Sequence, residues 1–107
     1  MISSSSTEQD VCLEEEIKTH TKTKRPPLYK VLLHNDDYTT MEFVIRVIRT
    51  IFGKTAEQAH EIMMMIHTNG IGVCGIYTKE IAETKVQQVI QMAKREGQPL
   101  KCSMEAQ

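Results

Sequence analysis

Three short segments of the chain show the apolar patterns of β-strands. Residues 28–34, LYKVLLH, are rich in residues that favour strands, so at least one face of this segment is expected to be buried. Residues 71–77 form a second predicted strand, in which Gly72 and Gly75 indicate a bulge or a close approach by another backbone. Residues 100–104 alternate apolar and polar side chains and predict a short third strand.

Three other segments repeat apolar residues at the three- and four-residue spacing of amphipathic helices. The first helix is expected after Thr39, whose hydroxyl is placed to cap it while Glu42 completes a capping box. Gly53 is placed to end this helix. Its predicted buried positions are Val44, Val47, Ile48 and Ile51.

The second helix is predicted between a capping box at Thr55–Gln58 and a closing Asn69-Gly70 pair. The third is predicted between its cap, Thr78, and Gly97. The predicted buried positions of the two helices are Ala59, Ile62, Met63 and Ile66, followed by Ala82, Val86, Val89, Ile90 and Ala93.

Together these segments predict one small α+β domain that spans residues 26–107. Their order, βααβαβ, predicts a three-stranded antiparallel sheet with the three helices packed on one face. Residues 1–25 are rich in Ser, Thr, Glu and Lys and carry few apolar side chains. Such a segment buries too little apolar surface to offset its ordering entropy, so we predict a flexible N-terminal tail.

Composition narrows the class of protein. A chain of 107 residues suits a single domain, and its net charge of −1 does not favour a nucleic-acid binder. No apolar run approaches the ~20 residues that cross a bilayer, and the N-terminus lacks a secretory signal pattern. Three cysteines without metal-like spacing fit free thiols in a reducing compartment. We therefore expect a cytoplasmic protein, and nothing requires it to be more than a monomer.

The candidate chemistry lies in the loop Asn35-Asp36-Asp37 and at His67. Met63 and His67 are four residues apart and so share one face of the second helix, while Met41 lies in the first turn of the helix that the loop enters. These residues are candidates to surround one hollow with a polar rim and an adaptable apolar floor. An α-ammonium group has three donors, which an amide oxygen, a carboxylate and a neutral imidazole nitrogen would accept.

Each of these features also has a simpler explanation. Asn and Asp are common turn formers, a histidine at a helix C-terminus interacts with the helix dipole, and methionines at helical spacing are usually core. The sequence lacks the patterns of an enzyme: a Ser or Cys with an evident His partner, a phosphate-binding glycine loop, or the ligand spacing of a zinc site. We expect no cofactor and no metal.

The sequence closely resembles the ClpS adaptors of the bacterial N-degron pathway, from about Pro27 through Leu100. The resemblance implies an adaptor without turnover of its own. Such an adaptor binds proteins that begin with Leu, Phe, Tyr or Trp and delivers them to the ClpA unfoldase of the ClpAP protease. The matching motifs, in register, are Tyr29-Lys30-Val31, Asn35-Asp36-Asp37-Tyr38-Thr39, Met41-Glu42-Phe43-Val44, Met63 to His67, Cys74-Gly75 and Ala82-Glu83-Thr84-Lys85-Val86.

Matched by position, the resemblance implies roles for the polar residues of the site. Asn35 and His67 would bond the α-amino group of the substrate, and Asp37 would help through an ordered water. Asp36 and Thr39 would hold the peptide backbone and the loop.

The resemblance also implies an apolar pocket and a docking surface. Met41 would shape the pocket against β-branched residues. Glu80 and Lys85 would dock on the N-terminal domain of ClpA, and the tail would correspond to the family's delivery segment. The neighbours of Met41 in the pocket would be Leu33, Val44, Met63, Ile66 and Leu100.

Two alternatives remain open from the sequence. One is a binding module that uses the same α+β fold for a ribosomal or other assembly partner, because a fold does not determine a function. The other is a metal-dependent hydrolase in which Asp36, Asp37 and His67 hold a divalent ion.

Overall fold

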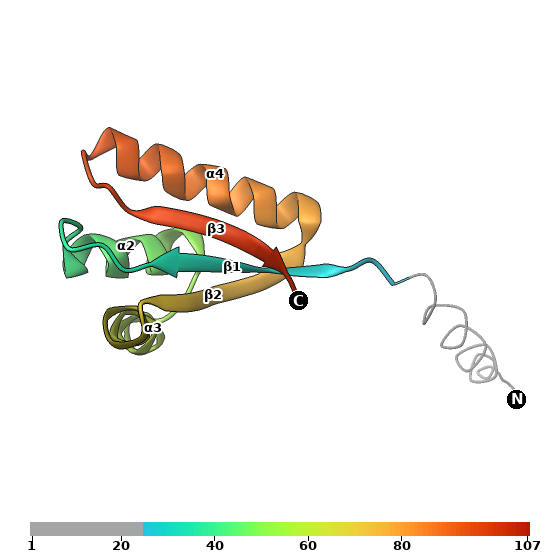
Figure 1. Ribbon diagram of the computed structural model, residues 1–107, viewed down its shortest axis with the longest axis horizontal. Coiled ribbons are helices and arrows are strands. Elements are labelled where there is room, and N and C mark those ends of the chain that lie inside the picture. The colour runs from blue at the N-terminus through green and yellow to red at the C-terminus, as the bar shows by residue number, and fades with distance from the viewer. Residues whose placement is uncertain (1–24) are drawn as a thin grey trace, which may run out of the picture.

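The computed structural model describes residues 25–107, and there the predicted order of elements and the α+β fold are confirmed (Figure 1). Within these residues, three helices accompany one three-stranded antiparallel sheet. The tail predicted for residues 1–25 lies outside the described residues, except for Arg25. The elements are β1 (Leu28–His34), α2 (Met41–Ile51), α3 (Ala56–Asn69), β2 (Ile71–Thr78), α4 (Lys79–Arg95) and β3 (Lys101–Ala106).

Strand β1 is the centre of the sheet, in the order β2-β1-β3, and pairs antiparallel with both neighbours. Val31 and Leu33 are fully buried and pack in the same core as side chains of all three helices. Because side chains alternate along a strand, Leu32 faces the opposite side of the sheet. The LYKVLLH segment therefore supplies the middle of the core.

The bulge predicted in β2 is confirmed. Val31 pairs with Gly75 and Leu32 with Val73, so Cys74 is the extra residue on the β2 side. Gly72 meets a different constraint, because a Cβ at this position would lie 2.7 Å from Cγ1 of Ile66. This glycine lets β2 approach α3 closely, which brings the start of the strand against the end of the helix.

The cap of α2 differs from the prediction by one residue. Thr40, not Thr39, caps the helix, and its hydroxyl oxygen accepts from the Phe43 amide at 3.1 Å. The chain is still turning at Thr39, whose amide donates to the carbonyl of Asp36. With the cap at Thr40 the capping-box position falls on Phe43 rather than on Glu42, so the predicted box does not form.

The other helix ends follow the predictions more closely. In α3 the capping box is complete, with the Thr55 amide donating to Gln58 and the Gln58 amide donating to Thr55. Thr78 occupies the cap position of α4 without a side-chain capping bond. No helix among residues 25–107 is both long and apolar enough to cross a lipid bilayer.

The buried face of α2 is rotated slightly from the predicted one. Phe43 is 1% exposed and belongs to the core, whereas the predicted Ile51 is only partly buried. In α3 and α4 the predicted Ile62, Val86 and Ile90 are likewise partly buried at the edge of the helix face.

The two cysteines in the described part of the chain, Cys74 and Cys102, are free thiols in the core. Burial raises the pKa of each to about 12. Since the thiolate is the reactive form, both groups should be almost inert at pH 8 in the folded protein.

We therefore predict that a Cys12→Ser variant reacts slowly with a disulfide-exchange reagent at pH 8. In denaturant both remaining thiols should react within the mixing time, at least about a hundredfold faster than in the native protein. The release of the coloured thiolate product measures both rates. Rapid reaction of two thiols in native buffer would contradict the burial of these side chains.

Candidate functional site

The loop after β1 is tied to the end of α3. The Asn35 amide donates to the carbonyl of Gly70 at 2.9 Å, directly beyond the pairing of His34 with Ile71. Gly70 ends α3 in a left-handed conformation, with φ of 87°, which a residue without a Cβ adopts readily. These contacts bring Asn35 to the last turn of α3, where His67 lies.

Asp36 is used to build the loop. Its Oδ2 atom accepts from the Tyr38 amide at 2.9 Å and from the Thr39 hydroxyl at 3.2 Å. The Asp36 carbonyl also accepts from the Thr39 amide. This arrangement is an Asx-type turn, in which a short polar side chain satisfies the backbone of the residues that follow it. It directs the chain from β1 into α2.

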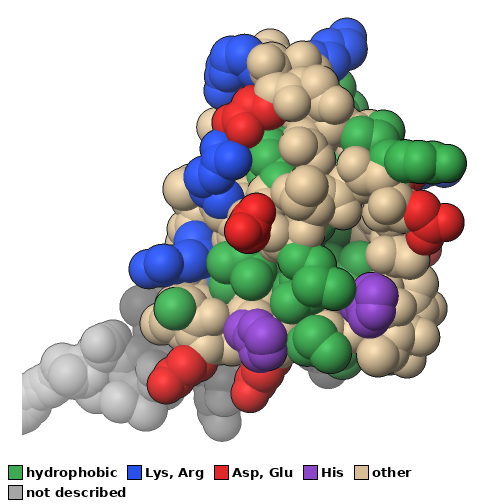
Figure 2. All heavy atoms as spheres, turned by 90° about the vertical axis from the view of Figure 1, so that its left-hand side faces the viewer, with side chains coloured by type: hydrophobic (Ala, Val, Ile, Leu, Met, Phe, Trp, Pro, Cys, Tyr) green, Lys and Arg blue, Asp and Glu red, His purple; other side chains and the backbone are tan. Residues whose placement is uncertain are grey.

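A cavity of ≈ 170 Å³ lies between this loop and the two helices that follow it in sequence. For comparison, an apolar protein cavity of about 150 Å³ holds a benzene ring. Figure 2 shows the side of the molecule where β1 ends, with hydrophobic side chains between histidines and acidic side chains close by. The lining residues are His34, Asn35, Asp36, Asp37, Thr39, Met41, Val44, Met63, Ile66 and His67.

The floor and the rim of the cavity differ in polarity. Val44 of α2 and Met63 and Ile66 of α3 are buried, and Met41 stands at the edge with 48% of its surface exposed. The side chains of Asn35, Asp37 and His67 are exposed, and within residues 25–107 they make no hydrogen bond. An amide, a carboxylate and an imidazole are therefore available to a ligand that enters the cavity.

Most of the predicted site residues line this cavity, but Leu33 and Leu100 do not. Leu33 is fully buried and Leu100 is 7% exposed, and both pack in the core. Neither side chain is therefore among those that the cavity presents to a ligand.

His34 also lines the cavity, although it is not among the site residues predicted from the sequence. Its Nε2 atom lies 2.7 Å from the Ser103 hydroxyl of β3. Its position directly before the Asn35 loop was the signal available in the sequence.

The metal alternative finds no support in the geometry. Among residues 25–107, no three or more His, Cys, Asp or Glu side chains lie close enough together to hold a metal ion. Asp36, Asp37 and His67 therefore do not form the ligand group that such a hydrolase requires.

Glu80 and Lys85, the predicted docking residues, lie on the first half of α4. Glu80 is exposed in the first turn. The Lys85 ammonium donates to the carbonyl of Ile51 at 2.8 Å and lies 5.6 Å from the centre of the Tyr77 ring. Lys85 thus satisfies a carbonyl at the end of α2, as basic side chains commonly do.

These features define a small α+β binding module, with an apolar cavity and a polar rim at one end of its sheet. A family model described as "ATP-dependent Clp protease adaptor protein ClpS" matches residues 24–103. The chain therefore belongs to the ClpS family. As a member of this adaptor family it is an adaptor of the Clp protease and not an enzyme, as the sequence predicted.

The chain is similar to the ATP-dependent Clp protease adapter protein ClpS of Desulfatibacillum aliphaticivorans, with 57% identity over 84 residues, 78% of this chain and 81% of that protein. It is also similar to the ClpS of Oleidesulfovibrio alaskensis, with 56% identity over 96 residues, 90% of this chain and 86% of that protein. A similar solved structure is Agrobacterium tumefaciens ClpS2 bound to L-phenylalaninamide, with a TM-score of 0.75 and 38% identity, covering 78% of this chain and 100% of that one.

The two neighbouring aspartates of the loop should differ in their effect on stability. Asp36→Ala removes the acceptor for two hydrogen bonds, so we expect it to lower the free energy of unfolding by about 1–2 kcal/mol. Asp37→Ala is the matched control and should change it by less than about 0.5 kcal/mol. Urea denaturation followed by circular dichroism measures both values, and equal losses would contradict the assignment of Asp36 to the turn.

Proposed function

We propose that this adaptor binds the free N-terminus of proteins that begin with Leu, Phe, Tyr or Trp and delivers them to the ClpA unfoldase of the ClpAP protease. The observation that carries the proposal is that one cavity combines an apolar floor with rim acceptors that have no hydrogen-bond partner within residues 25–107. The similar ClpS2 of Agrobacterium tumefaciens is bound to L-phenylalaninamide, which has a free α-amino group beside an aromatic side chain.

The rim suits a charged amine. The Asn35 amide oxygen and a neutral His67 imidazole nitrogen accept directly from the α-ammonium group, and Asp37 supplies negative charge through a water. Acetylation removes the charge and two of the three donors. It would leave the acceptors desolvated without partners, which is costly in a partly enclosed site.

The floor suits a large apolar side chain. Met63 and Ile66 from α3 and Val44 from α2 exclude water from it, and a methionine lining adapts to both aliphatic and aromatic shapes. Met41, at the edge, narrows the entrance and disfavours residues that branch at Cβ. Charged side chains are rejected because they lose hydration without gaining a partner.

Docking on ClpA belongs to the same proposal. Glu80 presents a carboxylate to the N-terminal domain of ClpA from the first turn of α4. Lys85, already bonded to Ile51, contributes through its exposed surface and by holding α4 against α2. Residues 1–25 act as the delivery segment.

The binding site is tested by fluorescence anisotropy with a labelled peptide that begins with Leu. The N-acetylated peptide and a peptide that begins with Glu should each bind at least about a hundredfold more weakly. Acetylation leaves the rim acceptors without donors, and the Glu side chain loses hydration without gaining a partner. Asn35→Ala and His67→Ala should each weaken binding by about tenfold. His60→Ala, an exposed histidine of α3 outside the cavity, is the control and should bind normally. Equal binding of all three peptides would refute N-terminal recognition.

The docking surface is tested by charge reversal. Glu80→Lys should leave the peptide affinity unchanged but lower the rate at which ClpAP degrades a fluorescent substrate with an N-terminal Leu by about tenfold. Glu57→Lys is the matched control, because Glu57 is the acidic residue in the first turn of α3. Degradation at the normal rate with the Glu80 variant would remove this residue from the interface.

A further inference from the structure

The backbone amide of the cap residue finds its hydrogen-bond acceptor in different ways in α2 and in α3. In α3 the amide of the cap residue, Thr55, donates to Oε1 of Gln58 at 3.0 Å, three residues along the chain. In α2 the corresponding position is Phe43, whose side chain cannot accept. The amide of the cap residue, Thr40, donates instead to Oε1 of Gln98 at 3.2 Å, 58 residues away. The start of α2 is therefore held by a tertiary contact.

Gln98 is itself held in the turn between α4 and β3. Its amide donates to the carbonyl of Ala93 at 2.9 Å, and the Gly97 amide donates to the carbonyl of Lys94 at 3.2 Å. Gly97 has a φ of 66°, a left-handed conformation that favours glycine and turns the chain back toward the sheet. The side-chain oxygen of Gln98 thus projects from an ordered turn.

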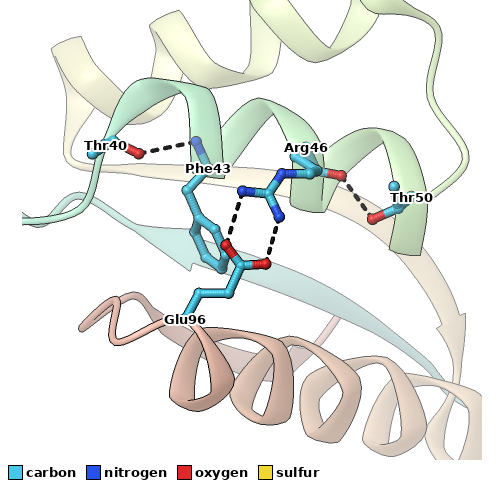
Figure 3. Close-up of polar contacts among 5 residues, drawn as sticks. All are labelled: Thr40, Phe43, Arg46, Thr50 and Glu96. Carbon is cyan, nitrogen blue, oxygen red and sulfur yellow. Dashed lines mark hydrogen bonds and ion pairs between the residues drawn. The ribbon is translucent and has the colours of Figure 1, made fainter.

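A second contact joins this turn to α2, as Figure 3 shows. Both terminal nitrogens of the Arg46 guanidinium, Nη1 and Nη2, donate to the Glu96 carboxylate, with 2.9 Å between Nη2 and Oε1. The hydrogen bonds from Arg46 lower the pKa of the Glu96 carboxyl. The guanidinium also lies 5.4 Å from the centre of the Phe43 ring, a buried residue of the same helix. Glu96 and Gln98 therefore restrain α2 at two points along its length.

The restrained segment carries one wall of the cavity. Met41 follows Thr40 directly and stands at the edge of the cavity, and Val44 lies one turn further along the helix. Gln98 itself is not among the lining residues. Thr39, on the other side of the Thr40 amide, also lines the cavity. A change in how firmly this amide is held therefore reaches the cavity through the backbone on both sides of it, at Thr39 and at Met41.

We propose that Gln98 is a positioning residue for substrate selection. By accepting from the Thr40 amide, it fixes the backbone at Met41 and thereby sets how strictly the cavity rejects N-terminal residues that branch at Cβ. The inference rests on the proposed recognition of N-terminal residues and adds to it a residue outside the cavity that controls selectivity.

The test compares three variants, each with one change at a side chain that accepts from a helix-cap amide. Gln98→Leu removes the acceptor, Gln98→Glu keeps an oxygen in its place, and Gln58→Leu removes the equivalent acceptor from α3. Peptides that begin with Leu and with Val compete for the site, and the ratio of their affinities is measured by anisotropy. Thermal unfolding is recorded for every variant.

We expect Gln98→Leu to lower the preference for Leu over Val by about three- to tenfold, because the backbone beside Met41 is then less firmly held. Gln98→Glu should keep the wild-type preference within about twofold. Gln58→Leu should lower the Tm by about as much as Gln98→Leu does, without changing the preference. By NMR the Thr40 amide should exchange with solvent faster in Gln98→Leu than in Gln98→Glu.

Three different results would overturn the inference. An unchanged preference in Gln98→Leu, in protein that still discriminates against the acetylated peptide, would refute the role of Gln98 alone. Wild-type protein that binds free and acetylated peptides equally would refute the proposed function and this role with it. An equal change of preference in Gln58→Leu would show a general effect of stability instead of positioning.

Discussion

The pairing of the central strand β1 with the beginning of β2 is the constraint on which the site depends. It places His34, at the C-terminal end of β1, beside Ile71, the first residue of β2, and the hydrogen bond from Asn35 to Gly70 extends this pairing into the loop. Gly72 permits the contact, because any side chain there would collide with Ile66 of the cavity floor. Without this close approach Asn35 and His67 would belong to separate surfaces. The register of β1 and β2 therefore positions both the floor and the rim of the cavity.

Adjacent residues of the loop serve different purposes because of their geometry. The Asp36 carboxylate accepts hydrogen bonds from Tyr38 and Thr39 of its own loop. The Asp37 carboxylate has no hydrogen-bond partner in the described part of the chain. A polar group bonded within the protein stabilises the fold, and one left at the rim of a cavity remains available for binding. The same division holds for the two residues proposed for docking, since the Lys85 ammonium is bonded to the carbonyl of Ile51 in α2 and Glu80 is exposed.

Much of the fold could be predicted because its signals are local. Apolar spacing predicted all three helices, the glycines predicted the bulge and the helix ends, and Thr55–Gln58 predicted a capping box that forms as expected. The predictions that failed depended on rotation or register. Thr39 and Thr40 each carry a hydroxyl that could cap α2. The turn built by Asp36 determines that Thr40 is the cap. Phe43 belongs to the core because of how α2 is rotated about its axis, which the spacing of apolar residues alone did not determine.

The sequence by itself determined the elements, the chemistry available in the loop and at His67, and the resemblance to an adaptor family, because each is encoded in neighbouring residues. Only the tertiary structure decided which side chains face the cavity. Leu33 and Leu100 match the apolar character of the floor, yet they lie in the core, whereas His34 at the end of β1 lines the cavity. The contact between Gln98 and Thr40 had no signal in the sequence. Neither residue belongs to a motif that joins them, and the packing of the α4–β3 turn against α2 brings their atoms within hydrogen-bonding distance.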